Sequence, residues 1–414
     1  MNGGTTDVEP LDARCCIVGG GPAGMMLGYL LARAGVDVVV LEKHADFLRD
    51  FRGDTIHPST LELMHELGLL AKFLQRPHDE VPHLNAWIGE SRLRLADFTH
   101  LPTHCKFIAF MPQWDFLNFF AEEARRFPSF RLLMRAEATD LLVEDGLVTG
   151  VRAKSAQGQL EIHAGLTIAA DGRHSVIRQK AGLEIINLGA PMDVLWMHIS
   201  RAESDPSMTL GRIDAGKFLA MLNRRAYWQC AFVIPKGGYD ELRARGLPAF
   251  RAQLAELAPF LRDRVEELAD WDQIKLLTVE VDRLKRWWRP GLLCIGDAAH
   301  AMSPVGGVGI NLAVQDAIAA ANILATPLRT RTAYDDELAS VQRRRELPTR
   351  ATQRIQIAVQ NNVIKRVLGN SRIKAPWILK LFDRWPLLQR IPARLIGMGF
   401  RPEHVKTPDA QSLR

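Results

Sequence analysis

The stretch that decides the fold is Arg14-Cys15-Cys16-Ile17-Val18-Gly19-Gly20-Gly21-Pro22-Ala23-Gly24. Its first half predicts a short strand that runs directly into a glycine turn. Residues 25–34 are good helix formers that stop at Gly35, and residues 36–41 are an almost unbroken apolar run. Such a run is typical of a parallel strand that is buried on both faces. Strand, helix and strand within about 30 residues form a βαβ unit, so the chain opens with an α/β domain.

The spacing of the glycines and of one acidic residue predicts a dinucleotide site. Gly19 permits the tight turn, Gly21 lets a pyrophosphate approach the backbone at the helix N-terminus, and Gly24 lets the helix lie close to the sheet. Glu42 ends the second strand, where it can accept two hydrogen bonds from a ribose diol. The predicted contacts are Gly19, Gly21, Pro22, Ala23, Gly24, Glu42 and Lys43.

Length and composition indicate a soluble globular protein. The chain has 414 residues, so two closely packed domains are the default expectation. Its hydrophobic fraction of 47% and charged fraction of 24% are ordinary for this class. We find no window with the roughly 18 uncharged apolar residues of a spanning helix. Residues 1–10 are polar and acidic, so we expect no signal peptide.

The cysteines argue against a disulfide framework and against a zinc site. There are five of them, an odd number, and none has Cys-x-x-Cys spacing. A reducing compartment is the simplest setting for such a chain. We therefore expect a cytoplasmic protein.

Positive charge is concentrated at the C-terminal end. The formal net charge of the chain is +6, yet residues 341–414 alone carry 16 Lys and Arg against four Asp and Glu. This basic region allows two interpretations. It could rest on an anionic membrane, with Trp377, Phe382 and Trp385 as interfacial anchors, or it could be a terminal helical layer packed on the first domain. No nucleic-acid-binding module accompanies the charge, so we expect no nucleic-acid partner.

Two further motifs lie far downstream of the glycine turn. The first is Ala170-Asp171-Gly172-Arg173-His174-Ser175-Val176-Ile177-Arg178, directly after an apolar strand. The second is Gly296-Asp297-Ala298-Ala299-His300, followed by Pro304-Val305-Gly306-Gly307-Val308-Gly309-Ile310-Asn311. With these three motifs in this order, residues 12–325 resemble the class A flavoprotein monooxygenases, the fold group of p-hydroxybenzoate hydroxylase.

The resemblance implies that FAD is the dinucleotide and assigns further residues to it. Asp171 would lie in a motif close to both the FAD pyrophosphate and the nicotinamide cofactor. Asp297 would hold the ribityl chain. Arg52 would lie near the flavin, Gln113 would contact FAD, and the carbonyl of Pro304 would face the substrate. The implied contacts in the flavin-facing loop are Gly307, Gly309, Ile310 and Asn311. Arg52 and Pro304 are the candidate catalytic residues.

The chemistry of the flavin-facing loop also follows from its residues. A reduced flavin is anionic. Gly306, Gly307 and Gly309 have no Cβ, so their amides can approach the ring closely. We expect a helix N-terminus near Asn311, whose dipole adds positive potential at the same place.

A single glycine turn leaves no separate Rossmann domain for a nicotinamide cofactor. NADPH or NADH is therefore expected to bind transiently in the cleft, as in the family. Lys43, His44 and Arg49 could meet a 2′-phosphate and favour NADPH, but a solvated basic edge explains them equally well.

The resemblance further implies the fold and its division. The fold class is α/β: a glutathione-reductase-like FAD-binding Rossmann domain, an interleaved β-sheet substrate domain and a helical C-terminal region. The FAD-binding domain would comprise residues 12–80, 111–184 and 286–340. The substrate domain would comprise residues 81–110 and 185–285, and residues 341–414 would form the basic helical region.

The implied activity is NAD(P)H- and O2-dependent hydroxylation of a hydrophobic aromatic or polycyclic substrate through a flavin hydroperoxide. His57, His198 and His300 are candidates for taking a substrate proton. The strand at 227–232 is expected to line the pocket with alternate residues, although either face could point inward. An FAD-dependent reductase or dehydrogenase without oxygen transfer is the alternative. A protein that holds flavin without turnover is disfavoured by the intact loop. The substrate and the oligomeric state stay open.

Overall fold

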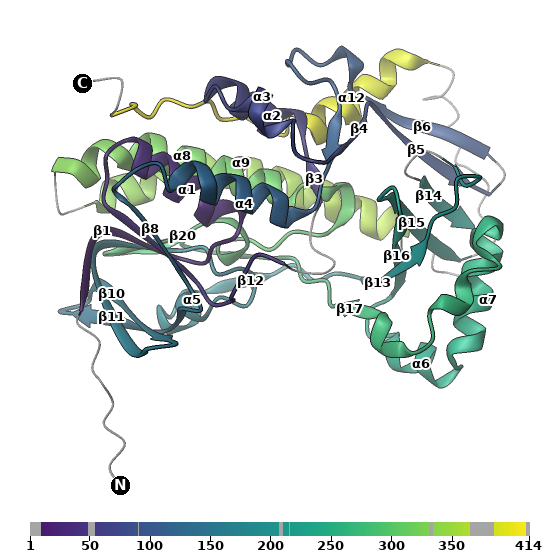
Figure 1. Cartoon of the computed structure of the whole chain (residues 1–414), viewed down its shortest axis with the longest axis horizontal. Helices are drawn as coiled ribbons and strands as arrows, with labels where there is room; N and C mark the ends of the chain where they lie inside the picture. The colour runs from purple at the N-terminus through teal and green to yellow at the C-terminus, as the bar shows by residue number, and fades with distance from the viewer. Residues whose placement is uncertain are drawn as a thin grey trace, which may run out of the picture.

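The computed structural model describes residues 10–48, 54–89, 91–206, 210–214, 216–330, 334–364 and 385–410. Figure 1 shows two adjoining halves, one with long helices along a mainly parallel sheet and one with a mainly antiparallel sheet. The chain enters the second half twice between strands of the first, so each half is assembled from separate stretches of sequence. Arg49, Arg52, Trp377 and Phe382 lie outside the described residues.

The first half is built on an eight-stranded sheet with the path β19-β20-β11-β1-β2-β8. Strands β10 and β9 continue from β11 as an antiparallel extension. The central strands are parallel, and Ile17 lies between Val40 and Ile168 with all three side chains fully buried. The strands are β1 (Leu11–Val18), β2 (Val38–Glu42), β8 (Phe130–Met134), β9 (Glu137–Glu144), β10 (Leu147–Ser155), β11 (Gly158–Ala169), β19 (Trp288–Arg289) and β20 (Leu292–Cys294).

Four helices lie along one side of this sheet, as Figure 1 shows: α1 (Pro22–Arg33), α4 (Gln113–Ala124), α8 (Gly309–Thr330) and α9 (Asp335–Val359). The span Val305–Thr330, which contains α8, is long and apolar enough to cross a membrane by length and composition. Every 18-residue stretch of this span contains the charged Asp316, so the expectation of no uncharged apolar window of that length stands. Because 83% of its apolar window is buried inside the protein, α8 is packed as a core helix.

The second half is a seven-stranded sheet in the order β17-β13-β16-β15-β14-β5-β6. One of its faces packs on α7 (Leu247–Leu257) through Trp228 and Phe232 of β16. The helix α6 (Tyr239–Ala244) precedes α7. The strands are β5 (His83–Ile88), β6 (Ser91–Asp97), β13 (Met192–Ser200), β14 (Leu210–Asp214), β15 (Lys217–Asn223), β16 (Tyr227–Pro235) and β17 (Lys275–Leu277).

Shorter elements complete the described structure. A three-stranded sheet has the order β3-β7-β4, and β12 pairs with β18. These elements are β3 (Thr55–Ile56), α2 (Pro58–Glu66), α3 (Leu70–Phe73), β4 (Asp79–Val81), β7 (Ile108–Phe110), α5 (Val176–Lys180), β12 (Ile185–Asn187) and β18 (Asp282–Leu284). The predicted α/β class, with its βαβ opening and its interleaved second sheet, is confirmed.

In the described part of the C-terminal region, residues 401–410 are not helical, which differs from the sequence expectation. Helix α9 continues into a π-helical turn at Gln360–Ile364, and α12 spans Pro386–Gly397. Residues 401–410 then run extended across the helices, where Asn322 Nδ2 donates a hydrogen bond of 2.8 Å to the carbonyl of His404. Pro402 and Pro408 lack the N–H that a helix needs. We call residues 401–410 the C-terminal strap.

Candidate active site

The glycine turn has a geometry that side chains would destroy. Gly19 has φ of +106°, and a Cβ there would lie 2.4 Å from the carbonyl oxygen of Ala170. A Cβ on Gly24 would lie 1.9 Å from the carbonyl oxygen of Gly19. The turn therefore holds β1, α1 and the end of β11 together at backbone contact distance.

Gly21 differs from its neighbours because the space beside it is open. It is the N-cap of α1, and no side-chain cap hydrogen bond is formed there. A Cβ built on Gly21 meets no described atom within 4 Å. The first amides of a helix are unsatisfied donors at the positive end of the helix dipole. Open space above such donors suits an anionic group, so the turn fits the pyrophosphate of FAD. Pro22 and Ala23 form the first positions of this helix.

Glu42 is fixed before any ligand arrives. Its Oε2 accepts a hydrogen bond of 3.2 Å from the N–H of Gly20, and its Oε1 accepts one of 3.0 Å from the N–H of His44. A carboxylate oxygen can accept more than one hydrogen bond, which is compatible with the predicted contact to a ribose diol. Lys43 is exposed beside it.

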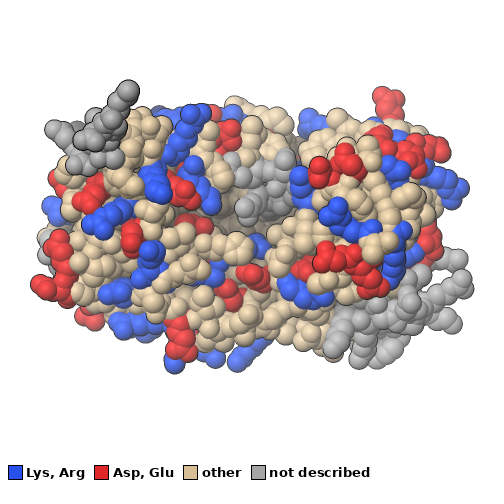
Figure 2. All heavy atoms as spheres, turned by 90° about the horizontal axis from the view of Figure 1, so that it is seen from below, with Lys and Arg blue, Asp and Glu red and all other residues tan. Residues whose placement is uncertain are grey.

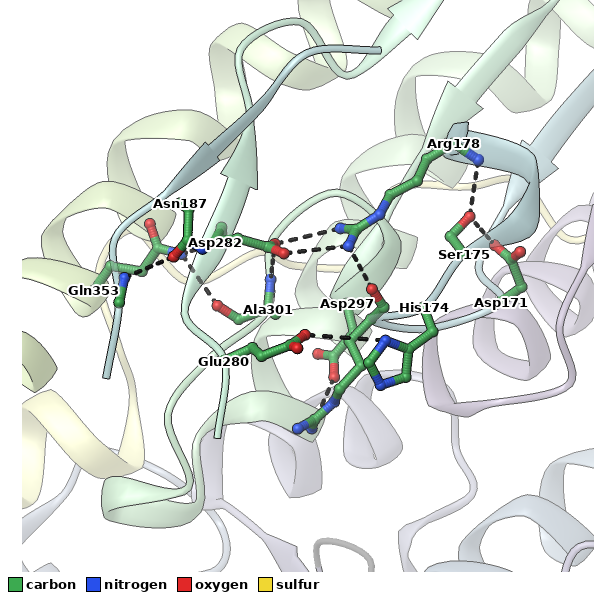
Figure 3. Close-up of polar contacts among 12 residues, drawn as sticks. Asp171, His174, Ser175, Arg178, Asn187, Glu280, Asp282, Asp297, Ala301 and Gln353 are labelled. Carbon is green, nitrogen blue, oxygen red and sulfur yellow. Dashed lines mark hydrogen bonds and ion pairs between the residues drawn. The ribbon is translucent and has the colours of Figure 1, made fainter. Parts of the chain in front are cut away.

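The Asp-Gly motif forms a buried polar network, drawn in Figure 3. Asp171 accepts hydrogen bonds from Ser175 Oγ at 2.5 Å and from the N–H of Ile177 at 3.3 Å. Arg178 reaches both carboxylate oxygens of Asp282 at 3.2 and 3.3 Å. Burial raises the pKa of Asp171 above its ordinary value, against the lowering effect of these hydrogen bonds. Asp171 therefore shapes the loop that carries the motif.

The Asp-Gly and Gly-Asp motifs meet in space. Arg173 Nη2 lies 3.4 Å from Asp297 Oδ2, and His174 lies 3.9 Å from Glu280 (Figure 3). The Asp297 side chain is 31% exposed and sits in the turn Gly296–Ala298. It thus keeps an open edge where ribityl hydroxyls could donate hydrogen bonds. Arg173 was not predicted as a partner of Asp297.

The flavin-facing loop is held from the first half of the chain. Gly307 has φ of +62°, and its carbonyl accepts a hydrogen bond of 2.8 Å from Thr55 Oγ1. Helix α8 begins at Gly309, two residues before the predicted start, and a Cβ on Gly309 would meet no atom of the described residues within 4 Å. Pro304 is half-buried, and its carbonyl accepts a hydrogen bond of 3.0 Å from the N–H of Gly307. Open space at Gly309 fits an approaching ring.

Asn311 supports this loop with its side chain. Its Oδ1 accepts hydrogen bonds from the N–H of His57 at 3.0 Å and from Thr60 Oγ1 at 2.7 Å. Its Nδ2 donates to the carbonyl of Thr55 at 3.3 Å. The amide is thus occupied by β3 and α2, so a contact with flavin is left to the backbone near it. Ile310 is buried in the first turn of α8.

Three buried glutamines of α9 and its π-helical extension form hydrogen bonds with residues 301–305. We call Gln353, Gln356 and Gln360 the glutamine ladder. Gln353 Nε2 donates to the carbonyl of Ala301 at 3.2 Å. Gln356 accepts from the N–H of Ser303 at 3.2 Å and donates to the carbonyls of Ser303 and Val305 at 2.9 Å each. Gln360 donates to Ser303 Oγ at 2.5 Å. The ladder fixes the segment that contains Pro304. The three glutamines are spaced three and then four residues apart, which places them on one face of a helix. This spacing is the only sign of the ladder in the sequence.

A buried ion pair joins the two halves beside the site. Arg224 Nη2 lies 2.5 Å from Asp54 Oδ2, and both side chains are under a tenth exposed. Asp54 Oδ1 also accepts a hydrogen bond of 3.3 Å from the N–H of Gln113, at the start of α4. Burial raises the pKa of Asp54, although Arg224 opposes the effect. Arg52 lies two residues before this pair, outside the described residues.

The sheet of the second half turns an apolar face to the loop. Ala231 and Val233 of β16 and Trp196 of β13 belong to a cluster that includes Val305 of the loop. The intervening residues of β16 pack on α7 instead. The face of β16 with Ala231 and Val233 is therefore the one that packs toward the loop. Figure 2 shows the surface hollowed between the two halves.

The three candidate histidines have different surroundings. His300 is buried, and its Nε2 lies 2.6 Å from Asp316 Oδ2. His57 is buried with Nδ1 2.7 Å from the carbonyl of Ile396, and burial lowers its pKa to about 4. His198 is exposed and shares the face of β13 with Trp196; its ring lies 4.6 Å from that of Tyr227. His198 is the candidate whose position allows contact with a ligand on this face.

Asp316 is the centre of a buried charge network. It accepts hydrogen bonds from the N–H of Gly296 at 3.0 Å and from Arg345 Nε at 2.9 Å. Arg345 Nη1 also lies 3.2 Å from Glu403 of the C-terminal strap. Burial alone raises the pKa of Asp316, but His300 and Arg345 outweigh it and hold the pKa below the ordinary value. This network connects the turn that carries Asp297 to the end of the chain.

Comparison with known proteins assigns the family. Residues 12–355 match a family model described as "FAD binding domain". The 6-methylpretetramide 4-monooxygenase of Streptomyces rimosus is 30% identical, over 92% of this chain and 91% of its own length. The 3-(3-hydroxy-phenyl)propionate/3-hydroxycinnamic acid hydroxylase of Escherichia coli (strain K12 / DH10B) is 27% identical, over 96% of this chain and 70% of its own.

Solved structures agree on the fold. The crystal structure of PqsL, a probable FAD-dependent monooxygenase from Pseudomonas aeruginosa, has a TM-score of 0.73 at 22% identity. The match covers 86% of this chain and 98% of that one. The resemblance seen in the sequence motifs is thereby confirmed. The chain belongs to the FAD-binding-domain family of class A flavoprotein monooxygenases.

Proposed function

We propose that this FAD-dependent monooxygenase uses NAD(P)H and O2 to hydroxylate a hydrophobic aromatic or polycyclic compound. The observation that carries the proposal is the apolar face of Trp196, Ala231 and Val233, which packs toward Val305 of the flavin-facing loop. Relatives whose names specify a monooxygenase or a hydroxylase support oxygen transfer over the reductase or dehydrogenase alternative.

Each residue of the site has a separate role in this proposal. Bound FAD supplies the redox chemistry and the activation of oxygen. The N-terminus of α1 binds its pyrophosphate, Glu42 orients the ribose, and Asp297 accepts hydrogen bonds from the ribityl chain. The backbone around Gly307 and Gly309 donates to the ring. The apolar sheet excludes water from the reacting atoms, and the carbonyl of Pro304 orients the substrate. Arg52 is proposed to lie beside the flavin.

The remaining assignments are parts of the same proposal. NADPH or NADH approaches transiently near Asp171. The FAD-binding domain comprises residues 12–80, 111–184 and 286–340, and the substrate domain comprises residues 81–110 and 185–285. Five cysteines, all free and buried, suit a reducing cytoplasm. No nucleic-acid partner is proposed. The peripheral membrane contact expected of residues 341–414 is a separate proposal, which the hydroxylation does not require.

The test is aerobic NAD(P)H consumption by the FAD-loaded protein across a panel of aromatic and polycyclic compounds. Peroxide and product mass are recorded in the same reactions. A compound that accelerates NAD(P)H loss and gains one oxygen atom supports the proposal. A double bond formed or reduced without oxygen gain contradicts it and favours the reductase or dehydrogenase alternative.

Replacing Gln356 by leucine is expected to separate NAD(P)H consumption from product formation. The change leaves the N–H and the carbonyl of Ser303 without their partner, and an unpaired buried polar group costs about 1–3 kcal/mol. The loop with Pro304 should then be less well placed, so that less product and more peroxide form per NAD(P)H consumed.

Gln342 provides the matched control on the same helix. It makes hydrogen bonds of 3.0 Å to the backbone of Trp287 and Lys285, away from the loop. Gln342→Leu should therefore leave the ratio of product to NAD(P)H unchanged. If wild type and Gln356→Leu, both at full FAD occupancy, form the same amount of product per NAD(P)H consumed, the glutamine ladder does not position the catalytic loop.

A further inference from the structure

Helix α12 exposes large apolar side chains in a narrow stripe. Leu387 is 63% exposed and Ile391 is 57% exposed, and Trp385 directly before the helix is 57% exposed. Leu387 and Ile391 are four residues apart, so they lie on one face of the helix. Exposed Arg390 and Arg394 are also four residues apart and form a basic stripe beside the apolar one.

The opposite face of α12 is tightly fixed. Gln389 and Ala393 are buried, and a Cβ on Gly397 would lie only 2.7 Å from Leu101 Cδ1. The carbonyl of Ile396 lies 2.7 Å from His57 Nδ1. Because these contacts set the rotation of the helix about its axis, the stripe of Leu387 and Ile391 points permanently outward.

We propose that α12 docks in the plane of an anionic lipid bilayer through Trp385, Leu387 and Ile391. A helix of 12 residues is too short to span the hydrocarbon core, which needs about 20. Apolar residues beside arginines are the chemistry of a helix lying at the interface, where the arginine stems lie along the apolar boundary and their charged ends reach the headgroups. Tryptophan favours the same depth.

Charge selects an anionic surface as the occupant. Residues 341–414 carry 16 Lys and Arg against four Asp and Glu, whereas the rest of the chain is net acidic. Figure 2, which views the molecule from the side opposite α12 in Figure 1, shows acidic and basic residues interspersed. Among the described residues, exposed Arg390 and Arg394 lie beside the apolar stripe, so an anionic bilayer would attract this face of α12.

The same helix lines a cavity next to the flavin-facing loop. The cavity is lined by Leu395, Ile396 and Met398 together with Val308 and Leu312. A docked α12 would thus place this cavity near the bilayer, where lipophilic compounds concentrate. This last consequence rests on the proposed function, whereas docking itself does not.

The test is co-flotation of the FAD-loaded full-length protein with vesicles, without substrate. One set of vesicles is phosphatidylcholine alone, and the other is an equal mixture with phosphatidylserine. We expect binding to the anionic set that is lost at about 1 M salt, where the Debye length is about 3 Å. The double variant Leu387→Ser with Ile391→Ser should bind roughly tenfold more weakly, and so should Arg390→Gln with Arg394→Gln.

Val143→Ser with Leu147→Ser is the matched control, because these side chains are 47% and 45% exposed on the β9–β10 hairpin. This variant should bind vesicles as wild type does. The proposal is overturned if wild type does not float with anionic vesicles, or if both pairs of serine variants bind vesicles equally well. It is also overturned if Leu387→Ser with Ile391→Ser converts a dimer to a monomer in solution. In the last case a second copy of the chain is the partner. Retained hydroxylation without lipid binding would leave the proposed function intact.

Discussion

Replacing Gly21 by alanine is expected to lower FAD affinity by about a hundredfold, or ~3 kcal/mol, while the protein stays folded. The backbone of Gly21 is compatible with any residue, and a Cβ there meets no described atom within 4 Å. In the folded protein the extra methyl group costs little, at most the ~1 kcal/mol typical of a poorer N-cap. It does fill the space that the pyrophosphate needs. Equilibrium flavin titration and thermal unfolding of the apoprotein measure the two effects separately.

Gly24→Ala is the companion variant, and it should lower the stability of the apoprotein, which Gly21→Ala leaves nearly unchanged. Its methyl group would lie 1.9 Å from the carbonyl oxygen of Gly19, so the backbone of the turn must shift. We expect the apoprotein itself to lose about 1–3 kcal/mol of stability, as overpacking does elsewhere. If Gly21→Ala instead retains FAD at wild-type affinity, the turn is not where the pyrophosphate binds.

The second large effect is expected for Arg345→Met. Arg345 is 1% exposed and lies between the carboxylates of Asp316 and Glu403. Removing one member of a buried ion network leaves uncompensated charge and costs about 3–5 kcal/mol. The free energy of unfolding in urea should fall by this amount.

Arg344→Met is the control for this variant. Arg344 is 41% exposed and makes one ion pair of 2.7 Å with Glu403, for which about 0–1 kcal/mol is expected. If the two variants lose similar amounts of unfolding free energy, burial does not determine how much the ion network contributes to stability.

The loss in Arg345→Met should also depend on pH. A carboxyl group whose pKa is depressed in the folded state stabilises the protein above its unfolded pKa, about 3.9 for Asp. That stability disappears as pH falls through the folded pKa. Because Arg345 contributes to the low pKa of Asp316, the difference between wild type and variant should be full at neutral pH and shrink below about pH 4.

Contiguous motifs made much of this structure predictable. The order of strand, glycine turn and helix specified the βαβ unit, and three motifs in sequence specified the family. Partners far apart in sequence were not predictable. Asp54 and Arg224 are 170 positions apart, and Arg173 and Asp297 are 124 apart, so the pairing of their charges depends on the folded path.

His300 illustrates a different limit. It adjoins the Gly-Asp motif in sequence, which made it a candidate for taking a substrate proton. In the structure its ring is buried, where it contacts Asp316 and Trp287. Sequence neighbours of a site residue can face opposite directions, and a strand such as β16 carries the same ambiguity because alternate residues serve different cores.

The glutamine ladder and the C-terminal strap also constrain how the enzyme matures during synthesis. The backbone at Ser303 and Val305 takes its shape from Gln356 and Gln360, and the turn at Gly296 is braced through Arg345 against Glu403. These supports follow the flavin-facing loop in the sequence, so they leave the ribosome after it. The glycine turn can fold early, but the flavin-facing loop must wait for them. We therefore expect capture of the ring to follow the emergence of these supports, so a chain truncated before Arg345 should be colourless.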